Sequence, residues 1–169
     1  AQDLSGLRWA FDCFRVASKI YDDDSIFDLP TELEMAYNNL NLPFRILPDS
    51  LGDMLPSVET LKSEVDFRVD KVYTASNLKL PERRQTAWQG DEDVGPFCYS
   101  GKSMPRSDWG PSVREIRDRL HVLTGVYYDC CLLNHYPMGN SGMRYHSDPD
   151  QGTLWDYDTA VVSVGATRR

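Results

Sequence analysis

Two apolar segments, residues 126–136 and 159–169, flank a polar loop that contains several glycines, and this arrangement constrains the fold most strongly. The first segment reads VYYDCCLLNHY and the second reads TAVVSVGATRR. Short runs rich in β-branched and aromatic residues, bounded by Gly, Pro, Asn and Ser, are typical of β-strands. The sequence therefore predicts that this part of the chain is built around strands 126–136 and 159–169.

The loop between these segments contains His146-x-Asp148, a histidine and a carboxylate two residues apart. In an extended backbone, residues i and i+2 project to the same side, so both side chains can reach one metal ion. One His and one carboxylate are two of the three protein ligands of the facial triad that holds non-haem Fe(II). On its own such a pair is also typical of a surface turn. The surrounding residues distinguish a metal site from such a turn.

The same alternation applies to the end of the first segment. If Asn134 and Tyr136 face inward, His135 faces outward and is excluded as a ligand of the same ion. His121 lies on the polar side of a predicted helix and is an equally poor candidate. Asn and Tyr side chains both donate hydrogen bonds, which suits them to a carboxylate ligand.

Residues 111–124 carry the clearest helical pattern, with apolar residues at Val113, Ile116, Leu120 and Leu123. Pro111 suits the first helical position and Gly125 suits the residue after the last. Its outer side carries charges of both signs, so we expect it to be a solvated face. The residues on that side are Arg114, Arg117, Arg119, Glu115 and Asp118. A shorter helix is predicted to begin after Ser57.

Charge is unevenly distributed along a chain whose net charge is −8. Residues 1–70 hold 6 basic and 14 acidic side chains, whereas residues 71–169 hold 12 of each. A nucleic acid is therefore expected to meet only the second part. The acidic first part is better suited to a basic protein partner, and an acidic loop at 90–95 argues against a phosphate groove beside it.

The four cysteines, Cys13, Cys98, Cys130 and Cys131, lack the paired spacing of a structural zinc site and the density of a disulfide scaffold. We expect reduced thiols and a nuclear or cytoplasmic location. The sequence contains no apolar run long enough to cross a membrane as a helix, so no membrane partner is expected.

The order of these motifs resembles the AlkB family of Fe(II)- and 2-oxoglutarate-dependent dioxygenases, which remove alkyl groups from nucleic-acid bases. The similarity covers roughly residues 80–169 and is closest to the branch that repairs alkylated DNA. It is carried by Arg84-Gln85-Thr86, Tyr99-Ser100-Gly101, Asn134-x-Tyr136, Gly139, Gly142, His146-x-Asp148-x-Asp150 and the segment that ends at Gly165-Ala166-Thr167-Arg168.

The resemblance implies a role for each matching residue, with Fe(II) and 2-oxoglutarate as cofactors and DNA or RNA as partner. Such enzymes hydroxylate the N-alkyl group, which then leaves as an aldehyde, while 2-oxoglutarate is converted to succinate. The implied metal ligands are His146 and Asp148, and the implied 2-oxoglutarate ligands are Asn134 and Tyr136. Asp150 would meet the exocyclic amine of the base, and Phe97 and Tyr99 would stack on the base. Arg83 and Arg84 would contact phosphates.

The fold that the resemblance implies is α+β, with a double-stranded β-helix, or jelly-roll, core and flanking helices. We expect an acidic, largely helical extension over residues 1–70 and a dioxygenase part over 71–169. The latter would comprise a substrate lid at 80–105, the helix at 111–124 and core strands within 126–169. The second metal histidine and the arginine that pairs with 2-oxoglutarate follow these strands in the family, so the core is expected to be incomplete at the C-terminus.

Two alternatives remain open at this stage. The protein could be a dioxygenase that acts on a protein side chain or another substrate that is not a nucleic acid. It could also be a truncated or naturally short form that binds without catalysing a reaction.

Overall fold

The computed structural model describes residues 47, 50–74, 76–142 and 158–166, and the fold is that of these residues. The chain separates into two compact units, residues 1–52 with 143–148 and residues 53–142 with 149–169. Only residues 47 and 50–52 of the first unit are described, so the helices and strands that follow belong to the second unit.

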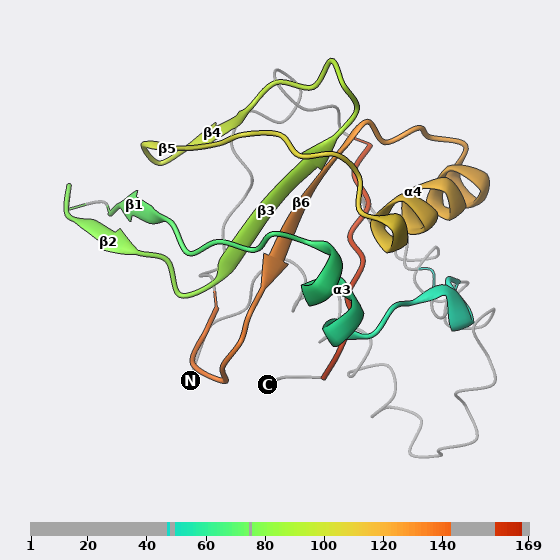
Figure 1. Ribbon diagram of the computed structural model, residues 1–169, viewed down its shortest axis with the longest axis horizontal. Coiled ribbons are helices and arrows are strands. Elements are labelled where there is room, and N and C mark those ends of the chain that lie inside the picture. The colour runs from blue at the N-terminus through green and yellow to red at the C-terminus, as the bar shows by residue number, and fades with distance from the viewer. Residues whose placement is uncertain (1–46, 48–49, 75, 143–157, 167–169) are drawn as a thin grey trace, which may run out of the picture. The chain divides into compact units, whose positions relative to one another are not determined.

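The described elements are short, apart from one helix and one pair of strands (Figure 1). In chain order they are a 3₁₀ turn η2 (Gly52–Met54), α3 (Val58–Glu64), β1 (Lys71–Tyr73), β2 (Lys79–Pro81), β3 (Gln85–Gly90), β4 (Phe97–Tyr99), β5 (Lys102–Met104), α4 (Pro111–Thr124) and β6 (Cys130–His135).

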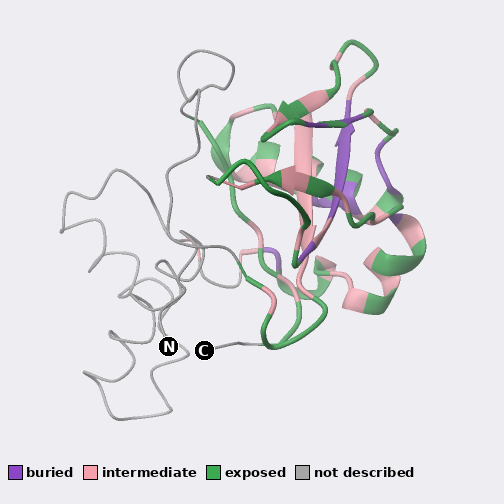
Figure 2. Ribbon diagram, turned by 90° about the vertical axis from the view of Figure 1, so that its left-hand side faces the viewer, coloured by how far each residue is buried: buried purple, intermediate pink, exposed green. Residues whose placement is uncertain are grey.

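The centre of this unit is the antiparallel pair β3–β6, in which Thr86 is opposite Asn134 and Trp88 is opposite Leu132. Figure 2 shows that β3 is buried along most of its length. Side chains of directly opposed residues project to the same side of a ladder, so this register sorts the residues into two faces. One face carries Thr86, Trp88, Asn134 and Leu132, and the other carries Gln85, Ala87, Leu133 and His135.

The second of these faces packs on the helices. Ala87 forms a buried cluster with Val65, Trp109 and Val113. Leu61, Phe67, Cys131 and Leu133 pack against the same cluster. This apolar contact between the ladder, α3 and the start of α4 is the core of the described unit.

Helix α4 has the predicted bounds, with Pro111 in its first turn and a left-handed Gly125 (φ 74°) at its end. Its first turn is capped by another element, because the Glu64 carboxylate accepts hydrogen bonds from Ser112 N (2.9 Å) and Ser112 Oγ (3.0 Å). A carboxylate at a helix N-terminus also interacts favourably with the helix dipole. Helix α3 begins, as predicted, after Ser57, whose hydroxyl accepts from Thr60 N at 3.0 Å.

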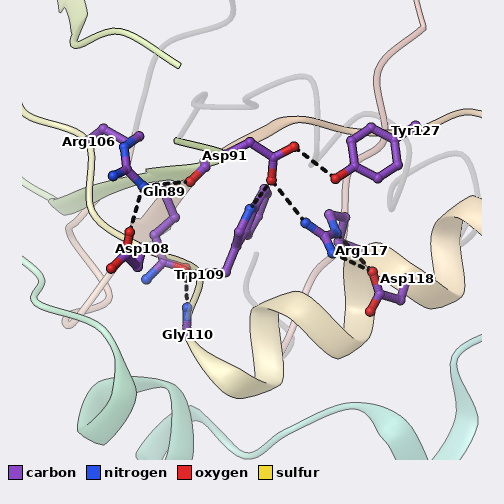
Figure 3. Close-up of polar contacts among 10 residues, drawn as sticks. Gln89, Asp91, Arg106, Asp108, Trp109, Gly110, Arg117, Asp118 and Tyr127 are labelled. Carbon is purple, nitrogen blue, oxygen red and sulfur yellow. Dashed lines mark hydrogen bonds and ion pairs between the residues drawn. The ribbon is translucent and has the colours of Figure 1, made fainter. Parts of the chain in front are cut away.

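A second polar contact attaches α4 to the loop after β3 (Figure 3). The Asp91 carboxylate accepts hydrogen bonds from Trp109 Nε1 (2.7 Å), Tyr127 Oη (2.8 Å) and Arg117 Nη1 (3.2 Å). The Arg117 guanidinium also lies 4.9 Å from the Trp109 ring centroid and 5.3 Å from that of Tyr127. One carboxylate therefore connects the end of β3, the helix and the segment before β6.

Two expectations from the sequence are corrected by the structure. The outer face of α4 is exposed at Arg114, Glu115, Asp118 and Arg119, as expected. Arg117 is the exception, since its side chain is only 13% exposed and is paired with Asp91. Residues 159–166, the described part of the second apolar segment, form no strand. Their apolar pattern suits a strand, but a strand also needs a neighbour for its backbone hydrogen bonds, and no ladder to this segment occurs within the described residues.

The described unit is of mixed α+β class, as expected. Its strands form three separate two-stranded antiparallel sheets, β1–β2, β3–β6 and β4–β5, and the described ranges contain no closed barrel. The predicted domain boundary at residue 70 stays a prediction, although residues 53–70 belong to the same compact unit as the strands.

Asp91→Asn is expected to lower the free energy of unfolding at pH 7 by about 1–2 kcal/mol, because a charged acceptor is replaced by a neutral one. The hydrogen bond from Trp109, and those from Tyr127 and Arg117, hold the pKa of Asp91 below its usual range. A lowered pKa stabilises the folded state above the ordinary carboxyl pKa of about 4, and this contribution is lost as pH falls through the lowered value.

Urea unfolding of both proteins between pH 7 and pH 3 measures this effect. The difference between wild type and Asp91→Asn should shrink toward the acidic end. Asp93→Asn, at an exposed position of the same loop, is the matched control and should change stability by less than about 0.5 kcal/mol. Equal pH dependence in the two variants would contradict the role given to Asp91.

Candidate active site

The face of the β3–β6 ladder that points away from the helices is polar at one end. Thr86 and Asn134 are opposed there. Arg84, just before β3, and Tyr136, just after β6, follow at the same end of the two strands. The phenol of Tyr136 is hydrogen-bonded to the Arg84 guanidinium. The structure thus brings together Asn134 and Tyr136, which the sequence resemblance assigns to the cosubstrate, and adds Arg84 beside them.

Asn134 has a feature that distinguishes it within the described part of the chain. Its Oδ1 atom is buried and has no hydrogen-bond partner there. Buried polar atoms are nearly always paired, and an exception usually marks a binding or catalytic position or an unseen ligand. Because the amide oxygen and nitrogen can exchange places by rotation of the amide group, Asn134 can present a donor to a carboxylate.

Arg84 is not the exposed residue that a phosphate contact requires, because its side chain is only 8% exposed. Its Nε donates to Glu82 Oε1 at 3.2 Å and its Nη2 donates to Tyr99 Oη at 3.1 Å. The guanidinium therefore lies inside the site, between Tyr99 and Tyr136, and the assignment of Arg84 to the nucleic-acid backbone is revised accordingly.

A buried salt bridge lies next to this arginine. Lys102 Nζ is 2.6 Å from Glu82 Oε2, and the two side chains are 2% and 7% exposed. Burial by itself would lower the pKa of Lys102, but its interactions with Glu82, Tyr99 and Asp70 outweigh this effect, so the pKa is raised and the amine stays charged. Neither Lys102 nor Glu82 was predicted from the sequence.

The two aromatic residues assigned to the base lie side by side on β4. The ring centroids of Phe97 and Tyr99 are 5.1 Å apart, and Phe97 also stacks on Trp88 of β3 at 5.0 Å. Burial raises the pKa of Tyr99, and the cations of Lys102 and Arg84 only partly oppose this effect. The hairpin β4–β5 therefore places one neutral phenol and one phenyl ring over the polar face of the ladder.

Arg83, unlike its neighbour, is exposed and lies just after the hairpin β1–β2. This hairpin exposes three large apolar or aromatic side chains, Tyr73, Leu78 and Leu80. Lys79 belongs to the same hairpin, and its Nζ lies 5.5 Å from the Tyr73 ring centroid. Apolar, aromatic and basic groups thus occur together on this exposed hairpin.

The two histidines that the sequence pattern excludes as metal ligands have other surroundings. His135 projects to the helix side of the ladder, where Nδ1 lies 2.7 Å from Gln85 Oε1 and the ring lies 5.5 Å from that of Phe67. His121 is exposed on α4 and makes an edge contact with Tyr127.

The predicted metal ligands His146 and Asp148, and Asp150 beside them, lie outside the described residues. Their roles stay predictions. Among the described residues there is no group of three His, Cys, Asp or Glu side chains that could hold a metal ion. No helix of the described ranges is long and apolar enough to span a bilayer.

Comparison with known proteins supports the family that the motifs resemble. No family model matches the chain. An uncharacterized protein, R406, of Acanthamoeba polyphaga mimivirus is 40% identical over 107 residues, which are 63% of this chain and 54% of that protein. The DNA oxidative demethylase ALKBH2 of Bos taurus is 29% identical over 85 residues, 50% of this chain and 30% of that protein.

A third relative is the human alpha-ketoglutarate-dependent dioxygenase alkB homolog 3, which is 28% identical over 112 residues. These are 66% of this chain and 38% of that protein. The chain thus spans about half, or less, of the length of the curated relatives that it matches. These partial similarities support an AlkB-like dioxygenase family. The two named relatives are a DNA oxidative demethylase and an alpha-ketoglutarate-dependent dioxygenase.

Arg84→Met should lower the free energy of unfolding by about 2–3 kcal/mol. The substitution removes the charged hydrogen bonds that Arg84 donates to Glu82 and Tyr99 in a buried site. Arg83→Met is the matched control at the adjacent, more exposed position and should stay within about 0.5 kcal/mol of wild type. Thermal or urea unfolding of the two variants measures the difference. Equal losses would show that the burial of Arg84 has no energetic consequence.

Proposed function

We propose that this protein is an Fe(II)- and 2-oxoglutarate-dependent oxidative demethylase of N-alkylated nucleic-acid bases. The observation that supports this best is the polar face of the β3–β6 ladder. There Asn134, with a buried amide oxygen that lacks a partner among the described residues, lies next to Tyr136 and Arg84, and an aromatic pair follows on β4.

The residues on this face suit a dicarboxylate cosubstrate. The Asn134 amide and the Tyr136 phenol would hold 2-oxoglutarate by donating hydrogen bonds to its oxygens, and the charge of Arg84 close to Tyr136 favours an anion there. With Fe(II) bound, O2 would be the oxidant that hydroxylates the alkyl group, and 2-oxoglutarate would supply two electrons as it loses CO2 to give succinate. The protein's own part is to orient the reactants and to exclude water.

The iron would be held by His146 and Asp148, an imidazole and a carboxylate that suit Fe(II). Asp150, two residues further on, would meet the exocyclic amine of the base, since a carboxylate accepts hydrogen bonds from such a group. These assignments come from the sequence pattern, and they complete the proposal for the residues around the metal.

For the substrate, we propose that Phe97 and Tyr99 stack on an extruded base, because such a base is held between aromatic or apolar faces. Arg83 and the basic, apolar hairpin β1–β2 would contact the nucleic-acid chain outside the site. Either DNA or RNA fits this description. The acidic residues 1–70 would avoid phosphates and recruit a basic protein partner, in the nucleus or the cytoplasm.

The same proposal extends to the fold. The β3–β6 ladder would be one pair of strands in a double-stranded β-helix, and the hairpin β4–β5, within residues 80–105, would belong to its substrate lid. In that architecture cofactor sites lie inside the roll, which agrees with the polar face of the ladder pointing away from the helices.

Incubation of the full-length protein with Fe(II), 2-oxoglutarate and N-methylated oligonucleotides tests the function. The expected result is one succinate and one formaldehyde for each methyl group removed, from single- or double-stranded DNA or from RNA. Turnover of methylated basic peptides but of no oligonucleotide would favour a protein substrate instead. Metal binding without any turnover would favour a non-catalytic form.

His146→Ala should abolish turnover and weaken Mn(II) binding, measured by electron paramagnetic resonance, by more than about tenfold, since a direct ligand is lost. His121→Ala changes an exposed histidine on α4 and serves as the control, with binding close to that of wild type. If both variants bind the metal as wild type does, His146 is not a ligand and the proposed metal site is wrong.

A further inference from the structure

The side chain of Lys102 is buried in the described unit, and all three of its ammonium protons have acceptors. Nζ lies 2.6 Å from Glu82 Oε2, 2.6 Å from Thr86 Oγ1 and 3.1 Å from Asp70 Oδ2. A buried charge with fewer partners would be strongly unfavourable. The pairing is therefore complete, and Lys102 joins β5 to β3 and to the loops that precede β1 and β3.

Stability alone does not account for a charged residue here. Replacing both members of a buried ion pair by apolar side chains of similar volume is often neutral or stabilising, because desolvation opposes the attraction between the charges. A buried ion pair instead fixes the arrangement of the residues around it. Each charged group forms hydrogen bonds in only a few relative orientations.

The neighbour that this arrangement fixes is Tyr99. Glu82 uses Oε2 for Lys102 and Oε1 for the Tyr99 hydroxyl, which donates to it at 2.9 Å. The same hydroxyl accepts from Arg84 Nη2 at 3.1 Å. The Lys102 ammonium also lies 4.8 Å from the centroid of the Tyr99 ring. The phenol is therefore held at its oxygen by two groups and at its ring by a cation.

We propose that Lys102 is a positioning residue that acts through Glu82 to fix the orientation in which the Tyr99 ring meets an extruded base. This inference rests on the proposed function, because that function assigns Tyr99 to the base. A ring fixed in advance loses less conformational entropy when the base stacks on it, so Lys102 strengthens substrate binding. None of the three ammonium contacts is with Asn134 or Tyr136, and Lys102 reaches Arg84 only through Glu82, which accepts from Arg84 Nε at 3.2 Å. We therefore expect a smaller effect on 2-oxoglutarate binding than on substrate binding.

Lys102→Met in the full-length protein removes the charged amine and keeps an unbranched side chain one atom shorter. We expect KM for a methylated oligonucleotide to rise about tenfold, because part of the stacking of the base on Tyr99 is lost. The kcat and the KM for 2-oxoglutarate should stay within about twofold of wild type. Lys62→Met, at an exposed position on α3, is the matched control and should leave all three constants unchanged.

A second measurement follows Tyr99 without any turnover. In protein labelled with ¹³C in its tyrosine rings, the Tyr99 resonance is assigned by its absence from Tyr99→Phe. It should shift in Lys102→Met and in Glu82→Gln, and not in Lys62→Met. The double variant Glu82→Gln/Lys102→Met should raise KM for the oligonucleotide no further than Lys102→Met does. Both substitutions break the same interaction, the ion pair between Glu82 and Lys102.

An unchanged Tyr99 resonance in both Lys102→Met and Glu82→Gln would overturn the inference, as would a fall in kcat with no change in KM. Glu82→Gln is nearly isosteric and keeps the test valid if Lys102→Met does not fold. If Tyr99 shifts as expected but wild type turns over no methylated oligonucleotide, the positioning role of Lys102 is supported and the proposed function is overturned.

Discussion

The register of β3 against β6 is the constraint on which the rest of the described structure depends. Opposed residues share a face, so pairing Thr86 with Asn134 places the polar groups on one side and Ala87 with Leu133 on the other. A slip of one residue would exchange the two sides. It would bring His135 to the polar face and press Asn134 into the apolar contact with the helices. The position of the candidate site therefore follows from how the core is packed.

The two faces are held together by different kinds of interaction. On the helix side, burial of Val65, Trp109 and Val113 supplies a non-directional apolar contact. On the other side, Glu82 and Lys102 form a buried ion pair whose net contribution to stability is small but whose geometry is specific. The first interaction stabilises the ladder, and the second determines where the hairpin β4–β5 lies over it. A site that binds a ligand needs both.

How much of this could be predicted from the sequence depends on the distance over which each residue acts. Helix α4 and the opposite orientations of Asn134 and His135 follow from local periodicity, and both were predicted. The burial of Arg84 and the pairing of Lys102 with Glu82 were not, because these contacts join residues that only the folded hairpins bring together. The apolar run at 159–166 fails as a strand for the same reason, since its local pattern does not specify a neighbouring strand.

The charge of the chain bears on how a nucleic acid would be recognised. Binding through phosphates requires an excess of basic side chains and weakens steeply with salt, yet residues 71–169 carry 12 basic and 12 acidic groups. Arg117, one of the basic groups, is already paired with Asp91, and Arg84 is buried. Stacking of a base on aromatic rings depends much less on net charge. Within the proposed function, recognition of the nucleic acid should therefore rely more on stacking of the base on Phe97 and Tyr99 than on contacts with the phosphates. The orientation of the Tyr99 ring is then a determinant of affinity.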